Sequence, residues 1–255
     1  MKIGFYIIAM LFFVGCSSNS PDRSDDLIVI DAGHGGHDSG ARFAGKHEKD
    51  LVLKITKKLY RELKSKGYRV YLTRDDDRFL KLGQRTRIAD RKDAKLFISV
   101  HANAIANKSR YEIAEGVETY FLQKTRDARS QRIAARENAS VLQGTDQLSR
   151  DVIIDSVLTG PKIIQSHKLA IDVQNGMVRN LNKSFSNVKD GGVRPGPFYI
   201  LVGASRPSIL VEVGYLTNTK ERERLYLSAY QDRIVQGIVE GVGIYIDNRK
   251  REVGF

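Results

Sequence analysis

Short runs of apolar residues alternate along the chain with longer segments in which apolar residues recur every three or four positions. The first pattern is typical of buried strands and the second of amphipathic helices. Leu51, Ile55, Leu59 and Leu63 show the helical spacing, and Gly67 ends that helix. This alternation predicts a single α/β domain with a mainly parallel, twisted sheet of about six strands and helices on both faces. We expect strands at residues 27–30, 68–72, 96–100, 116–122, 198–202 and 208–213, and further helices at 80–94, 163–181 and 225–246.

The first residues have the pattern of an export signal. Ile3–Val14 is an apolar run of 12 residues, which is too short to span a membrane. The residues Phe13-Val14-Gly15-Cys16 resemble the lipoprotein signal of bacteria, in which the cysteine receives the lipid. A plain secretory signal, in which Cys16 is incidental, is the alternative. We therefore expect a signal peptide at 1–15 and a polar tether at 16–26.

Composition and charge narrow the classes of function. The 255 residues carry 42 Lys and Arg against 30 Asp and Glu, a net charge of +12. The length fits one large domain, which we place at 27–248 and follow with a basic tail at 249–255. Excess positive charge often indicates nucleic-acid binding, but export argues against that partner. Attraction to an anionic cell envelope, or a merely solvated basic surface, explains the charge better.

Cysteine usage limits the metal chemistry. A single cysteine can form neither an internal disulfide nor a thiolate cage for zinc, so a metal site would use His, Asp and Glu. His34 and His101 follow the first and third predicted strands, and Glu212 lies near the end of the last. Open α/β sheets bind ligands at these strand ends. Glu212 has apolar neighbours and is costly to bury unpaired, although an ion pair with a nearby Lys or Arg is the plain alternative.

Glycines surround His34, but they do not form a phosphate-binding motif. We expect them to permit close approach of the backbone, so that the imidazole points into an open cleft.

Several motifs follow one another in a fixed order. They are Asp31-Ala32-Gly33-His34-Gly35-Gly36-His37-Asp38-Ser39-Gly40-Ala41, His47-Glu48-Lys49-Asp50, Leu72-Thr73-Arg74, Leu82-Gly83-Gln84-Arg85, Phe97-Ile98-Ser99-Val100-His101-Ala102-Asn103-Ala104 and Leu210-Val211-Glu212-Val213-Gly214-Tyr215-Leu216-Thr217-Asn218. Together they resemble the zinc-dependent N-acetylmuramoyl-L-alanine amidases of the amidase-3 family, from about Ile28 to Tyr245. The family has Pro where this chain has Ala32, and Phe-Ile-Ser at Tyr215-Leu216-Thr217; neither change touches a ligand.

The resemblance implies a Zn²⁺ site at the strand ends, with His34, Glu48 and His101 as ligands. Two imidazoles and one carboxylate with an open fourth position are a known catalytic zinc set. A solvated residue in the first turn of a helix is the alternative for Glu48. Glu212 falls on the family's catalytic glutamate, which takes a proton from the attacking water and passes it to the leaving amine. The implied bond joins the lactyl group of N-acetylmuramic acid to the L-alanine of the stem peptide.

One segment, Gln123–Gln165, distinguishes this chain from a minimal amidase. Its arginines recur at helical spacing between residues 126 and 136. The segment resembles the insertion of the cell-separation amidases, in which a helix covers the zinc until an activator protein removes it. We expect an autoinhibitory element in which an acidic residue, Glu137, caps the metal. An ordinary packed helical insertion is the alternative.

The sequence therefore predicts a periplasmic zinc amidase, lipid-anchored at Cys16, that cleaves peptidoglycan in cell separation or wall remodelling. Ser17 after the cysteine favours the outer membrane over the inner. We expect Arg85 to brace loops by ion pairing, and Asn103 to orient His101 or to contact substrate. A zinc peptidase acting within the stem peptide is one alternative. A non-catalytic wall-binding homologue is another, but the presence of all the ligand and catalytic residues argues against it.

Overall fold

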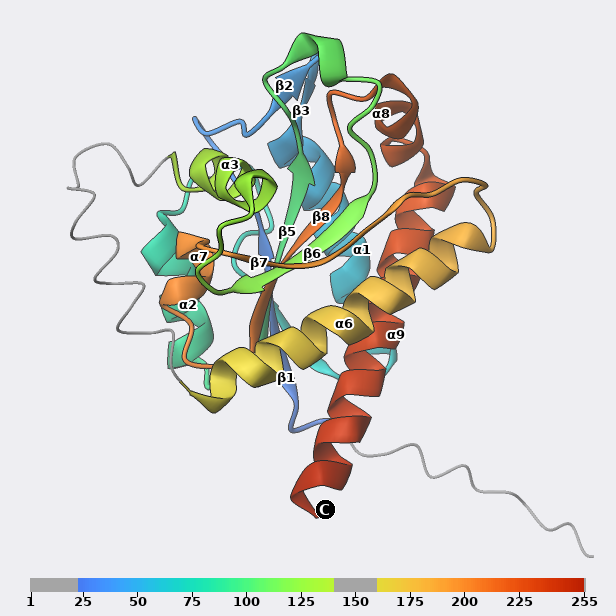
Figure 1. The fold of residues 1–255 in the computed structure, drawn as a ribbon. Helices are drawn as coiled ribbons and strands as arrows, with labels where there is room; N and C mark the ends of the chain where they lie inside the picture. Colours follow the sequence, from blue (N-terminus) through green and yellow to red (C-terminus); the bar gives the residue numbers. More distant parts are fainter. Residues whose placement is uncertain (1–22, 140–159, 255) are drawn as a thin grey trace, which may run out of the picture.

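A six-stranded sheet forms the centre of the domain in the computed structural model, which describes residues 23–139 and 160–254 (Figure 1). Its strands are β1 (Leu27–Ala32), β4 (Arg69–Leu72), β5 (Leu96–Asn103), β6 (Val117–Leu122), β7 (Asp190–Gly196) and β8 (Ser208–Tyr215). They lie in the order β4-β1-β5-β8-β6-β7, and all neighbouring pairs are parallel except β6 and β8. The predicted mainly parallel sheet of six strands is confirmed.

Helices cover both faces of this sheet (Figure 1). On one face lie α1 (Glu48–Ser65), α6 (Pro161–Asn182) and α9 (Ser228–Val253). On the other lie α2 (Leu82–Arg91), α3 (Ala128–Glu137) and α7 (Tyr199–Val202). The remaining elements are a short hairpin of β2 (Arg42–Phe43) and β3 (Lys46–His47), a 3-10 turn at Lys108–Arg110, and α8 (Thr219–Leu225). No helix of the described residues is both long and apolar enough to cross a membrane.

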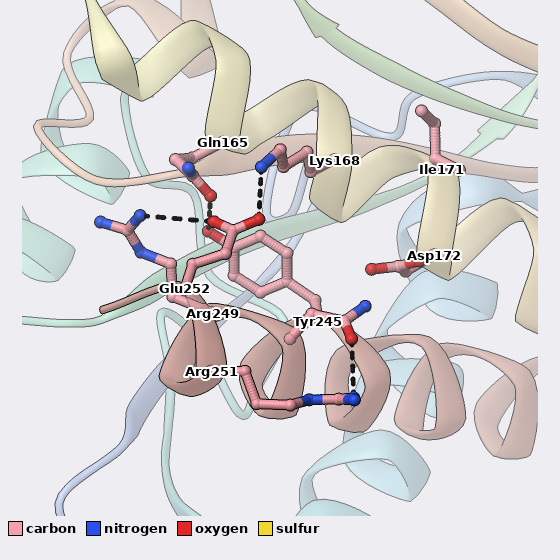
Figure 2. A pocket seen from close by; sticks show the side chains of 9 residues that line it. Gln165, Lys168, Ile171, Asp172, Tyr245, Arg249, Arg251 and Glu252 are labelled. Carbon is pink, nitrogen blue, oxygen red and sulfur yellow. Dashed lines mark hydrogen bonds and ion pairs between the residues drawn. The ribbon is translucent and has the colours of Figure 1, made fainter. Parts of the chain in front are cut away.

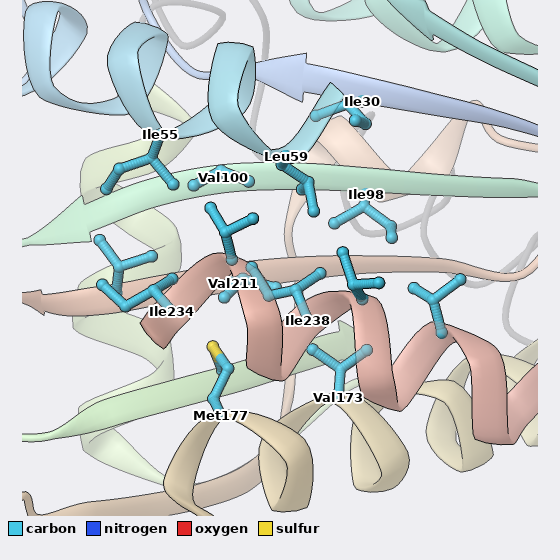
Figure 3. Close-up of a cluster of buried hydrophobic side chains, with 14 of the residues drawn as sticks. Ile30, Ile55, Leu59, Ile98, Val100, Val173, Met177, Val211, Ile234 and Ile238 are labelled. Atoms are coloured by element: carbon cyan, nitrogen blue, oxygen red, sulfur yellow. The ribbon is translucent and has the colours of Figure 1, made fainter. Parts of the chain in front are cut away.

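Alternate residues of β1, β5 and β8 enter two separate cores. Ile98 and Val100 of β5 join the core under α1, α6 and α9 (Figure 3). Phe97 of the same strand belongs to the core under α2, α3 and α7. Every residue of β1, β5 and β8 is buried. Burial of each large apolar side chain stabilises the fold by about 1.5–3 kcal/mol. Because both faces are covered, these strands appear in the sequence as continuous apolar runs rather than alternating ones.

Three elements differ from the sequence-based prediction. The strand predicted at 198–202 is wrong: residues 199–202 form the short helix α7, because a short apolar run fits a buried helix as well as a strand. The strand β7 was not predicted, since its sequence holds three glycines and Pro195, which an edge strand tolerates. The helix predicted at 225–246 is α9, but it begins at Ser228 and continues to Val253 through most of the expected basic tail, whereas Leu225 ends the separate helix α8.

Candidate metal centre and catalytic site

Two histidines and two glutamates converge at the carboxyl ends of β1 and β5. His34 follows β1, Glu48 begins α1, His101 lies in β5 and Glu137 ends α3. One potential ligand atom from each lies within 4.8 Å of the others. The fold thus brings together the three residues that the resemblance implied as zinc ligands and the glutamate that we expected to cap the metal.

The two carboxylates face the same pair of ring nitrogens. Glu48 Oε1 lies 3.2 Å from both His34 Nε2 and His101 Nδ1. Glu137 Oε2 lies 2.8 Å from His101 Nδ1 and 3.2 Å from His34 Nε2. Within the described residues, the buried atoms His34 Nε2 and Glu137 Oε2 have no hydrogen-bond partner. Four inward-facing ligand atoms, two of which have no hydrogen-bond partner, are compatible with a cation site.

The charges of this cluster also fit a divalent metal. Burial opposes protonation of His101, but Glu137 and Glu48 outweigh it and raise the pKa of His101 to about 9. Burial opposes protonation of His34 as well, but Glu48 and Asp38 raise the pKa of His34 well above its usual value. The carboxylates thus favour positive charge at this point. Imidazole nitrogens and carboxylate oxygens are the ligands of divalent metals such as zinc, so the residues present fit such an ion.

Glycines allow these ligands to meet. A Cβ atom on Gly33 would lie 2.4 Å from the His101 ring, and one on Gly40 would lie 2.5 Å from the His34 ring. The expected close approach of the backbone is therefore present. His34 itself has a φ of 58°, a left-handed conformation that is unfavourable for a side chain of this size. Asp38 Oδ2, which lies 3.0 Å from His34 Nδ1, fixes the ring on its other side.

A buried ionic network holds the loop that carries His34. Arg85 Nη1 lies 2.9 Å from Asp31 Oδ1, and Arg85 Nη2 donates to the His34 carbonyl at 2.7 Å. Arg74 Nη2 donates to the Gly33 carbonyl at 2.7 Å. The expected ion pair of Arg85 is therefore present, and it acts on the backbone beneath the ligand. Arg85 is 1% exposed, and it lines a small pocket together with His34, His101 and Glu137.

Glu212 lies beside His101, its partner in the register of β5 and β8. It is fully buried, and neither carboxylate oxygen has a hydrogen-bond partner within the described residues. Arg136 Nη2 approaches one of these oxygens at 3.5 Å, which is a long ion pair. Burial, together with the charge of Glu137, raises the pKa of Glu212 well above its usual value despite Arg136. A carboxylate of this kind binds a proton more readily than an exposed glutamate does, as a group that moves protons requires.

Sequence reasoning missed Glu118, which lies directly opposite Glu212 in the antiparallel register of β6 and β8. It is fully buried, forms an ion pair with Arg129 of α3, and accepts a hydrogen bond from the Tyr120 hydroxyl at 2.7 Å. The signal was available, since Glu118 is a lone carboxylate in an otherwise uncharged strand, as is Glu212. Side by side on one face of the sheet, His101, Glu212 and Glu118 form a row across three strands.

Asn103 contacts this row from β5. Its Nδ2 donates to Glu118 Oε2 at 3.4 Å, and its Oδ1 accepts from Arg136 Nη1 at 3.3 Å. Within the described residues it makes no hydrogen bond to His101, and its contact with substrate stays a prediction. Its side chain is fully buried beneath α3.

The helix α3 covers the whole row. Glu137 enters the metal cluster, Arg136 faces Glu212, and Arg129, two turns earlier, pairs with Glu118. Further contacts fix the helix in place: Arg136 Nη1 donates to the Ala104 carbonyl at 2.8 Å, and Arg129 Nη2 donates to the Tyr215 hydroxyl at 2.8 Å. Of the segment 123–165, residues 140–159 lie outside the described residues, as do Cys16 and the expected signal peptide.

The sheet carries, at its strand ends, a His/Glu cluster that could hold a metal ion and a buried, weakly paired carboxylate. These features together are typical of metal-dependent hydrolases. The amidase-3 family, described as N-acetylmuramoyl-L-alanine amidase, matches residues 28–243. The chain belongs to this family of peptidoglycan amidases.

Individual relatives agree with this assignment. N-acetylmuramoyl-L-alanine amidase AmiA of Escherichia coli is 30% identical over 231 residues, which are 88% of this chain and 78% of AmiA. The crystal structure of an N-acetylmuramoyl-L-alanine amidase from Clostridium difficile superposes with a TM-score of 0.67 at 29% identity, covering 89% of this chain and 99% of that one. The CwlD amidase of Clostridioides difficile, solved in complex with the GerS lipoprotein, gives a TM-score of 0.64 at 26% identity, covering 88% and 100%.

Proposed function

We propose that this protein is a zinc-dependent amidase that cleaves peptidoglycan between the lactyl group of N-acetylmuramic acid and the L-alanine of the stem peptide. The observation that carries the proposal is the convergence of His34, Glu48 and His101 on one point, with Glu212 adjacent to it in the sheet. Membership of the amidase family supports the choice of bond.

In this proposal His34, Glu48 and His101 hold the zinc. The bound ion supplies Lewis-acid chemistry toward the attacking water and the scissile carbonyl. Glu212 accepts the proton of the water and delivers it to the amide nitrogen as that nitrogen leaves as an amine. Its burial among apolar neighbours suits both roles, because the carboxyl group holds a proton more readily than an exposed glutamate does.

The described conformation is the resting, autoinhibited state in our proposal. Glu137 takes the ligand position that substrate or water would need, and Arg136 faces the carboxylate that must move the proton. Substrate therefore reaches Glu212 only when α3 moves away from the residues that it covers, His101, Glu212 and Glu118. We infer that an activator protein removes α3. The CwlD–GerS complex shows a family relative bound to a protein partner, which supports the search for one.

We further propose that the protein acts in the periplasm during cell separation or wall remodelling, anchored by lipid at Cys16. Ser17 after the cysteine favours the outer membrane over the inner. The sequence at 13–16 supports the anchor. Labelling with a radioactive fatty acid would test it: the wild-type chain should incorporate label, and Cys16→Ser should not. Label on the Cys16→Ser chain would contradict the assignment.

Digestion of purified peptidoglycan tests the reaction itself. The chain with α3 released by Arg129→Ala should liberate stem peptides with an L-alanine amino terminus and leave the glycan intact, as read by mass spectrometry. A chelator and Glu212→Gln should each abolish release, because they remove the metal or the proton carrier. Cuts within the stem peptide would instead identify a zinc peptidase. Specific wall binding without any release would identify a non-catalytic homologue.

The autoinhibited state has its own matched test. Arg129→Ala removes the ion pair with Glu118 and should raise basal release at least about tenfold, since a lost charged hydrogen bond is worth about 1.5–3 kcal/mol. Arg132→Ala removes the same charge from an exposed position of the same helix, and its activity should stay at the wild-type level. Equal activity of all three chains would show that α3 is an ordinary packed helix.

A further inference from the structure

A basic cavity lies at the end of the sheet opposite the metal cluster. Its volume is about 460 Å³, and it opens beside the first residues of β1 and β4, whereas the cluster lies at the carboxyl end of β1. Three of its lining residues are basic and none is acidic. The lining consists of Leu27, Lys64, Arg69, Val70, Tyr71 and Lys92.

The three cations of this cavity are not neutralised by the protein. Within the described part of the chain, Lys64, Arg69 and Lys92 form no ion pair, and all three are exposed. The ring of Tyr71 lies 4.0 Å from Lys92 Nζ and offers only a cation–π contact. Lys64 and Lys92 lie at the C-terminal ends of α1 and α2, where a helix dipole favours them, but its half charge does not balance a full one.

A second cavity, between α6 and α9, shows the contrasting case (Figure 2). Two of its three basic residues, Lys168 and Arg249, form ion pairs with the carboxylate of Glu252. The third, Arg251, donates to Asn248 Oδ1 at 2.9 Å. An anion would have to displace Glu252 there. The cavity beside β4 requires no such exchange, so it is the better site for an anionic ligand.

The amino-terminal segment leaves the domain at the same end. Arg23 forms an ion pair with Asp247 near the end of α9 at 3.2 Å, and its guanidinium stacks on the ring of Tyr68, directly before Arg69. Cys16 is seven residues earlier in the chain, a distance of at most about 25 Å when fully extended. A lipid on Cys16 would therefore hold this end, and not the end with the metal cluster, close to the membrane.

We propose that the cavity formed by Lys64, Arg69 and Lys92 binds the phosphate headgroups of anionic phospholipids. The occupant follows from the positive charge of the cavity and from the place where the lipid-bearing segment leaves the domain. Headgroup binding would direct the strand ends that carry Glu212 away from the bilayer, toward the wall. The choice of occupant and this orientation rest on the proposed lipid anchor, whereas the positive charge of the cavity does not.

Vesicle sedimentation tests the proposal on the mature chain that begins at residue 16, with Cys16→Ser so that no lipid is attached. This chain should bind vesicles that contain phosphatidylglycerol and should not bind pure phosphatidylcholine. The triple variant Lys64→Gln, Arg69→Gln, Lys92→Gln should bind about 100-fold more weakly, because each basic residue at an anionic surface contributes about 1 kcal/mol. Thermal unfolding should be unchanged, since all three side chains are exposed.

A matched variant separates this site from net charge. Lys54→Gln, Lys57→Gln, Lys220→Gln removes the same charge from other exposed positions and should retain most of the binding. Equal losses in both variants, or no binding of the unsubstituted chain to phosphatidylglycerol, would overturn the proposal. So would tight binding of inorganic phosphate without vesicle binding, which would mark a site for free phosphate. Amidase activity on a soluble peptidoglycan fragment should be the same in both variants, so failure of the proposed reaction can be told apart from failure of this site.

Discussion

At the scale of single residues, Asp31 shows how a buried charge supports the site without touching substrate. Its carboxylate is fully buried and accepts hydrogen bonds from Arg85, Thr73 and Ser99. Burial alone would raise the pKa of Asp31, but Arg85 and the two hydroxyls outweigh it and lower that pKa. The charge of Asp31 thus fixes Arg85, and Arg85 fixes the backbone of His34.

Asp31→Asn should lower the free energy of unfolding at pH 7 by about 3 kcal/mol or more, because it leaves Arg85 buried without its counter-charge. The folded-state pKa of Asp31 lies below the unfolded value, so its contribution is complete above about pH 4 and is lost as the pH falls through the folded-state pKa. The difference in the free energy of unfolding between wild type and variant should therefore become smaller in acid. Denaturant unfolding at a series of pH values measures this difference.

The exposed ion pair of Asp232 and Lys58 provides the control for this prediction. Asp232→Asn should change stability by less than about 1 kcal/mol, since solvent screens the pair. The buried network does not act through the charge of Asp31 if Asp31→Asn loses no more stability than Asp232→Asn. The same conclusion follows if the stability loss of Asp31→Asn is independent of pH.

At the scale of elements, α6 and α9 pack with their backbones in close contact, and glycines make this contact feasible. A Cβ atom on Gly237 would lie 2.4 Å from the Cα atom of Met177, and one on Gly176 would lie 2.2 Å from the Gly237 carbonyl oxygen. Backbone atoms cannot rotate away as a side chain can. The two helices share the core that packs against β5 and β8.

Gly237→Ala should therefore destabilise the protein by about 1–3 kcal/mol, as overpacking of a core does, and lower the unfolding midpoint by several degrees. Gly243→Ala is the matched control on the same helix, because its Cβ atom would meet nothing closer than 3.7 Å. Alanine is favoured over glycine within a helix by about 1 kcal/mol, so Gly243→Ala should raise the midpoint. Calorimetry of the two variants should give shifts of opposite sign; equal shifts would refute the packing argument.

At the scale of the whole molecule, the metal cluster connects segments that are distant in the chain. Its four residues come from the loop after β1, from α1, from β5 and from α3. An ion bound there would bind only the folded state, in which these segments meet. Binding would therefore stabilise the entire domain rather than one loop.

Zinc should raise the unfolding midpoint of metal-free protein by about 5–10 °C at a concentration one hundred times the dissociation constant. His101→Ala should remove most of this shift, because it deletes a ligand. His167→Ala, an exposed histidine of α6 that stacks on Phe121, should retain it. Differential scanning calorimetry measures the shift, and a shift that survives in His101→Ala would place the metal elsewhere.

The sequence by itself determined the strands and helices whose apolar spacing is regular, and hence the α/β architecture. It also indicated His34, His101 and Glu212, because parallel strands that are buried on both faces carry their polar residues at the carboxyl ends. Glu48 followed only from the family resemblance, since a glutamate in the first turn of a helix is common.

Only the tertiary structure decided which residues cover these groups. Glu118 became part of the site through the antiparallel register of β6 against β8, and Arg129 and Arg136 acquired partners through the docking of α3. The apolar run at 198–202 forms the helix α7, whose Ile200 and Leu201 pack in one core with residues of α2 and α3. Local pattern fixes what a segment can form, whereas register, docking and the basic cavity beside β4 depend on contacts between residues far apart in the chain.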